Sequence, residues 1–132
     1  MDEKIAATTG ETRATPSKAT SCVVDEQWVG RIVVVSVSGV VDMLTVPQLE
    51  QAVRAALDQQ PGGLVVDFTE VDFLASAGMG VLVAVHDEVT PHMRFCVVAD
   101  GPATSRPLKL VGVADLIKLY ATRDEALSAL SA

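Results

Sequence analysis

The segment VDFLASAGMG, residues 71–80, places a serine where a loop is expected to turn into a helix. Two glycines, Gly78 and Gly80, follow in the first turns, although a glycine inside a helix costs up to about 1 kcal/mol relative to alanine. A bare backbone lets another chain or a phosphate group approach closely. Ser76 would lie at the positive end of the helix dipole, where an added phosphate is tolerated. The serine also suits a plain N-cap role, so both interpretations stay open.

Other kinds of chemical site are not indicated. A hydrolase elbow needs glycine two residues before the serine nucleophile, and Leu74 stands there. The glycines at 78–80 do not complete a dinucleotide fingerprint, and the chain has no Gly-Lys-Ser/Thr phosphate loop. His86 and His92 lack acidic or cysteine partners at metal-ligand spacing. The sequence therefore predicts no catalytic residue, no metal and no cofactor, so the protein is expected not to be an enzyme.

The overall charge excludes several partners. Ten Lys and Arg residues against seventeen Asp and Glu give a net charge of -7. Duplex DNA and anionic membranes need clustered positive charge, and an aromatic content of 4% argues against stacking on single-stranded nucleic acid. Cys22 and Cys96 are too few for a disulfide scaffold, and the N-terminus shows no apolar leader. We expect a cytoplasmic protein that binds neither nucleic acid nor membrane.

Strand-like and helix-like segments alternate along most of the chain. Residues 31–38 are β-branched and predict a buried strand, preceded by a shorter strand at 22–27, with a connection at 39–44. Thr45 and Gln48 suggest a capping box for a helix whose apolar face is Val46, Leu49, Val53, Ala56 and Leu57. Further expected elements are a strand at 64–68, a link at 69–75, a helix from 76 to Pro91, a strand at 94–99, a short helix at 106–111, a strand at 116–120 and a terminal helix opened by a capping box at 122–125.

This alternation predicts an α/β fold with a small, mixed, mostly parallel sheet flanked by about four helices. Residues 1–21 are rich in Thr, Ser and Ala without periodicity, and they predict a flexible N-terminal tail. A single domain is therefore expected over 22–132, within a chain of 132 residues.

Several stretches together resemble the STAS domain family. They are SGVVD at 38–42 before a helix, Asp67-Phe68, FLASAGMG at 73–80, and LVGV at 110–113 followed by Leu116-Ile117. The likeness covers roughly residues 22–130, and the most similar branch is the stand-alone bacterial anti-sigma factor antagonists. Either short motif alone would be a weak signal, but their order along the chain is fairly specific.

The resemblance implies a regulatory switch, for instance in a stress response. In this family the unphosphorylated form binds an anti-sigma factor, which is an ATP-using serine kinase, and so releases the sigma factor. Phosphorylation of a serine abolishes the binding, and a serine phosphatase resets the protein. The matching serine is Ser76, and Asp42 matches an acidic residue beside the phosphorylation site. The implied partner-binding residues are Asp42, Ala75, Ala77, Gly78, Met79 and Leu82.

One departure from the family pattern keeps a second reading open. The family has aspartate immediately before the serine, whereas this chain has Ala75. That favours an alternative function, a STAS interaction or scaffold module of a signalling or transport complex that is never phosphorylated. A third possible class of function is a small-molecule or nucleotide sensor, and only the two glycines support it.

Overall fold

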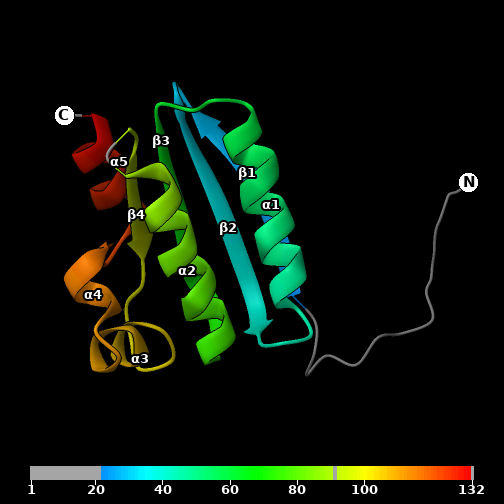
Figure 1. Ribbon diagram of the computed structural model, residues 1–132. Helices are drawn as coiled ribbons and strands as arrows, with labels where there is room; N and C mark the ends of the chain where they lie inside the picture. Colours follow the sequence, from blue (N-terminus) through cyan, green and yellow to red (C-terminus); the bar gives the residue numbers. More distant parts are fainter. Residues whose placement is uncertain (1–21, 91, 132) are drawn as a thin grey trace, which may run out of the picture.

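The computed structural model describes residues 22–90 and 92–131, which form one sheet with helices on both faces (Figure 1). The predicted tail at 1–21 and the helix end predicted at Pro91 lie outside the described residues. Among the described residues, no helix is both long enough and apolar enough to cross a membrane.

The sheet has five strands in the order β1-β2-β3-β4-β5. The first pair is an antiparallel hairpin, and the remaining neighbours are parallel, so the predicted mixed, mostly parallel sheet is confirmed. The strands are β1 (Cys22–Val29), β2 (Ile32–Val41), β3 (Gly63–Leu74), β4 (Arg94–Val98) and β5 (Lys118–Tyr120).

Five helices lie within the described residues, where the sequence predicted about four. They are α1 (Val46–Asp58), α2 (Ser76–Val89), α3 (Ser105–Leu110), α4 (Val113–Leu116) and α5 (Arg123–Ser131). The unpredicted helix is α4, a single turn that lies before the last strand and overlaps the stretch expected for that strand only at Leu116. Its four residues are too few to show helical periodicity in the sequence.

The two faces of the sheet are covered differently. Helices α1 and α2 pack on one face, where Val33, Val35 and Val37 of β2 join the larger apolar core. On the other face α5 covers a smaller cluster that contains Ile32 and Val34. Side chains alternate along a strand, so Ser36 and Ser38 continue this second face as a polar stretch.

Both central strands run further than the sequence predicted. The connection expected at 39–44 and the link expected at 69–75 are too long, because β2 continues to Val41 and β3 to Leu74, which leaves only residues 42–45 and Ala75 between strand and helix. These ends pair with each other through two irregularities in register, between Ser36 and Ser38 and between Gly39 and Val40. Strand pairing between distant segments therefore overrides the mixed polar and apolar pattern of residues 69–73.

The predicted helix caps are only partly correct. Thr45 precedes α1, but its side chain caps no amide of that helix, so the capping box with Gln48 is wrong. At α5 the Glu125 amide does donate to Thr122 Oγ1 at 3.2 Å. The Glu125 carboxylate accepts a hydrogen bond from the Ala121 amide at 3.2 Å, whereas in a capping box it would accept one from the Thr122 amide.

Candidate functional site

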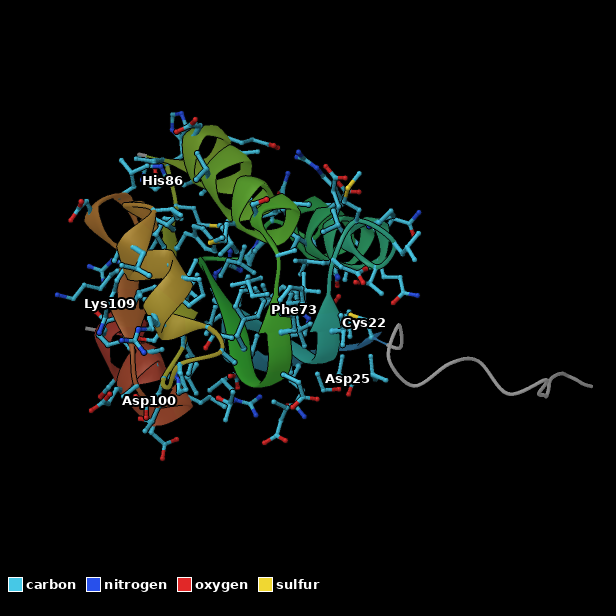
Figure 2. The ribbon with its side chains drawn as sticks, turned by 90° about the horizontal axis from the view of Figure 1, so that it is seen from below. Cys22, Asp25, Phe73, His86, Asp100 and Lys109 are labelled. Carbon is cyan, nitrogen blue, oxygen red and sulfur yellow. The ribbon has the colours of Figure 1, made fainter. Side chains whose placement is uncertain are left out.

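The ends of β2 and β3 bring two segments of the predicted site together. Val41 pairs with Leu74, and the Ala75 amide donates to the Val41 carbonyl at 2.8 Å. The loop that begins at Asp42 therefore lies beside the first turn of α2. Figure 2 views the molecule from this end, with Phe73 near the middle of the picture.

Ser76 is the first residue of α2, and its side chain is exposed. The N-cap is Ala75, whose backbone is extended with φ -83° and ψ 165°, and no side chain caps this end of the helix. The interpretation of Ser76 as the N-cap is therefore wrong. Its hydroxyl stands at the positive end of a 14-residue helix, where a negative group is stabilised by the helix dipole.

Three of the predicted partner-binding residues are buried in the structure. Met79 is 7% exposed and Leu82 is 1% exposed, and both pack in the larger core cluster. Gly78 is buried as well, and a Cβ there would lie 2.6 Å from Val41 Cγ1 and 2.8 Å from Leu74 Cδ1. The absence of a side chain at Gly78 thus lets α2 approach the sheet, rather than opening the backbone to another chain.

Gly80 has the opposite environment, although the sequence gives both glycines the same reading. It is exposed, and a Cβ built there meets no described atom within 4 Å. Internal packing therefore does not explain a residue that weakens the helix. Gly80 is the position at which α2 presents bare backbone outwards, together with the exposed Ser76.

Asp42 orders the loop between β2 and α1. Its Oδ1 accepts hydrogen bonds from the amides of Leu44 at 2.9 Å and Thr45 at 3.1 Å. The Thr45 hydroxyl donates to the Val40 carbonyl at 2.7 Å and accepts from the Asp42 amide at 2.9 Å. Thr45 is only 3% exposed, so this small network holds the loop from inside.

The structure also shows candidate contact residues that sequence reasoning missed. Met43 and Leu44 in the loop are 81% and 75% exposed, and Phe73 near the end of β3 is 55% exposed. Large apolar side chains exposed at one end of a sheet are a common mark of a protein interface. A signal was present in the sequence, because Met43 and Leu44 are adjacent large apolar residues in the connection before α1, outside the apolar face predicted for that helix.

Both cysteines are free thiols, one half-buried and one buried. Burial raises the pKa of Cys22, the nearby charge of Asp42 raises it further, and a hydrogen bond with Thr45 lowers it. Burial alone raises the pKa of Cys96 to about 12, so this thiol is protonated and unreactive at neutral pH. Within residues 22–90 and 92–131, no three His, Cys, Asp or Glu side chains are grouped to hold a metal ion.

Comparison with known families matches the STAS domain to residues 25–126. The chain belongs to the STAS domain family. It is also 34% identical over 113 residues to the anti-sigma-F factor antagonist RsfB of Mycobacterium tuberculosis, covering 86% of this chain and 90% of that relative.

Solved structures agree with the family. A crystal structure of an anti-sigma factor antagonist from Mycobacterium paratuberculosis matches with a TM-score of 0.82 and 41% identity, over 85% of this chain and 96% of that one. The anti-sigma factor antagonist SpoIIAA in its unphosphorylated form matches with a TM-score of 0.70 and 20% identity, over 83% and 96%. The second likeness shows the STAS fold alone.

Proposed function

We propose that this protein is an anti-sigma factor antagonist of the bacterial cytoplasm, a binding module that frees a sigma factor by binding its anti-sigma factor. The observation that carries the proposal is the 41% identity and 0.82 TM-score to a solved anti-sigma factor antagonist over most of both chains. The 34% identity to a second antagonist supports the same function.

The contact surface that we propose lies at the carboxyl ends of β2 and β3. It comprises the outward side of the first turns of α2, with Ser76 and Gly80, and the exposed Met43, Leu44 and Phe73. Asp42, Ala75 and Ala77 are half-buried at its edge. Apolar side chains at the centre of such a surface would supply burial, and the bare Gly80 would allow close approach of the partner.

We further propose that phosphorylation of Ser76 switches this contact off. The partner would be a serine kinase that transfers the γ-phosphoryl group of ATP to Ser76 Oγ, and a serine phosphatase would reverse the step. The phosphate would add about -1.5 to -2 charges at neutral pH. At the first position of α2 this charge is compatible with the fold, so the effect would fall on the bound partner, through repulsion and desolvation.

Ala75 changes which groups can hydrogen-bond the start of α2, compared with the family pattern that has aspartate at this position. Ala75 is the N-cap, a position where aspartate accepts hydrogen bonds from the first amides of the helix. With alanine those amides have no side-chain acceptor, so a phosphate on Ser76 would find donors close by. The same alanine is the observation that favours the alternative, a STAS scaffold module that is never phosphorylated.

The test uses four versions of the protein as baits in lysate of the native host: wild type, Ser76→Ala, Ser76→Glu and Ser128→Glu. Ser128 is an exposed serine of α5, so its substitution adds the same charge elsewhere. We expect mass spectrometry to identify an anti-sigma factor on every bait except Ser76→Glu. Incubation of the captured complex with ATP should then yield a phosphopeptide that contains Ser76.

Two outcomes separate the parts of the proposal. If no bait captures an anti-sigma factor, the antagonist function is wrong. If all four baits capture it equally, the function stands but Ser76 is not its switch, and the unphosphorylated module is the better description.

A further inference from the structure

A cavity of about 450 Å³ lies on the face of the sheet opposite α2. Its floor is the polar continuation of β2 and β3, with Ser36, Asp67 and Glu70, and its wall is the start of α5. The cavity borders the carboxyl ends of β4 and β5, because Asp67 pairs with the last residue of β4, Val98. Open α/β sheets commonly bind ligands beside the carboxyl ends of their strands.

Asp67 is the unusual group in this cavity, since a carboxylate that is only 8% exposed lines it. One oxygen, Oδ1, accepts hydrogen bonds from the Thr69 amide at 2.9 Å and from the Thr69 hydroxyl. The register irregularity between β2 and β3 falls at this point, so Oδ1 satisfies a local backbone amide. The second oxygen has no hydrogen-bond partner among the described residues, and because Asp67 lines the cavity, this oxygen can accept a hydrogen bond from a donor bound there.

The rest of the lining adds negative charge and hydrogen-bond acceptors. Glu70 and Asp124 contribute two more carboxylates to the cavity. The positively charged member, Arg123, is hydrogen-bonded to Gln27 on β1. Three carboxylates against one guanidinium therefore favour a cationic ligand over an anionic one.

The spacing of the carboxylates selects the kind of cation. They come from β3 and from α5, and within residues 22–90 and 92–131 no three acidic, His or Cys side chains are grouped closely enough to hold a metal ion. A flexible chain that carries ammonium groups can donate to several separated acceptors, which a single ion cannot. The volume also falls in the range of small-ligand pockets, about 300–1,000 Å³.

We propose that the cavity between β2, β3 and the start of α5 binds an alkylammonium group, with Asp67 as the buried acceptor. The group belongs either to a free diamine or polyamine or to a lysine side chain of a protein. The site is separate from the surface around Ser76, because α2 and α5 cover opposite faces of the sheet. The inference is therefore independent of the proposed antagonist function.

The test is a titration of the ¹⁵N-labelled full chain with putrescine and with spermidine at constant ionic strength. Binding is monitored by the NMR chemical shifts of the backbone amides. We expect saturable shifts at Ser36, Thr69 and Thr122, which line the cavity. Asp67→Asn keeps an oxygen for the Thr69 amide but removes the charge, so the affinity should fall at least about tenfold. The matched control is Asp72→Asn, an exposed position on the same strand outside the cavity.

Further arms identify the source of the ligand and guard against a folding defect. Nα-acetyl-lysine methylamide represents a lysine side chain of a protein. If putrescine binds more tightly than this probe, the ligand is a free amine. If the probe binds more tightly, the ligand is a lysine side chain. Tetramethylammonium, which cannot donate hydrogen bonds, should not saturate the site. If Asp67→Asn loses its folded spectrum, Asp124→Asn, exposed at the start of α5, takes its place.

Two results would overturn the proposal. One is the absence of saturable shifts with every amine. The other is an equal loss of affinity in the Asp67→Asn and Asp72→Asn variants, which would indicate nonspecific attraction to an acidic protein.

Discussion

The junctions that leave β2 and β3 lie side by side but are held by different forces. The β2–α1 junction is tied by hydrogen bonds of Asp42 and Thr45, while its Met43 and Leu44 side chains stay exposed. The β3–α2 junction has no side-chain cap and is held by burial of Gly78 and Leu82 beneath it. The outward side of the first turns of α2, with Ser76 and Gly80, is thus left without an internal role, and the phosphorylation proposed there would affect a partner without disturbing the fold.

The largest expected effect separates the buried side of α2 from its outer side. Leu82→Ala removes a side chain that is 1% exposed, and the free energy of unfolding should fall by about 2–5 kcal/mol. Urea unfolding followed by circular dichroism measures this loss. Val83→Ala, at a half-buried neighbour on the same helix, should cost less. Unchanged stability of Leu82→Ala would mean that this side of α2 is not core.

The next effect tests whether hydrogen bonds hold the β2–α1 junction. Thr45→Val keeps the shape of the side chain but leaves the Asp42 amide and the Val40 carbonyl without the hydroxyl. We expect a loss of about 1–3 kcal/mol in the free energy of unfolding, because the site is buried. Thr90→Val, at the exposed end of α2, is the control and should leave stability nearly unchanged. Equal effects of the two substitutions would mean that the Thr45 hydroxyl does not hold the β2–α1 junction.

The two glycines of α2 should respond with opposite signs. Gly78→Ala forces a Cβ against Val41 and Leu74, and overpacking of this kind costs about 1–3 kcal/mol, offset in part by better helix propensity. Gly80→Ala meets no neighbour and should stabilise the protein by up to about 1 kcal/mol. Thermal unfolding of both variants measures the difference. A stabilised Gly78→Ala would show that α2 has room to move away from the sheet.

Gly80→Ala also separates stability from binding. If the partner approaches the bare backbone at Gly80, this variant will be more stable than wild type yet bind the anti-sigma factor less tightly. Surface plasmon resonance with the captured partner measures the affinity. Unchanged affinity would place the contact away from this turn of the helix.

The smallest expected effect on folding is at Ser76. Ser76→Glu places a negative charge at the first position of α2, where the helix dipole favours it by about 0.3–1 kcal/mol. The unfolding midpoint in urea should therefore stay the same or rise slightly. Ser128→Glu, in the C-terminal half of α5, is the control for a negative charge added elsewhere on the surface. A clear loss of stability with Ser76→Glu would indicate that phosphorylation acts by unfolding the site rather than by altering a surface.

Local pattern determined much of this protein. The run of β-branched residues at 31–38 predicted the strand β2, and the spacing of Leu49, Val53 and Ala56 predicted the buried face of α1. The helix start at Ser76 could also be predicted, because apolar residues at helical spacing, such as Met79 and Leu82, follow it directly. These features depend on neighbours in sequence, so the sequence carries them directly.

Tertiary structure alone decided the rest. The extension of β3 to Leu74 depends on pairing with a distant strand, and the buried position of Asp67 depends on its place between Ser36 of β2 and Val98 of β4. Gly78 and Gly80 are chemically identical, and only the contact of α2 with Val41 and Leu74 makes one of them a packing residue. Burial is set by what lies opposite a residue in space, and two residues of one helix can therefore have unrelated roles.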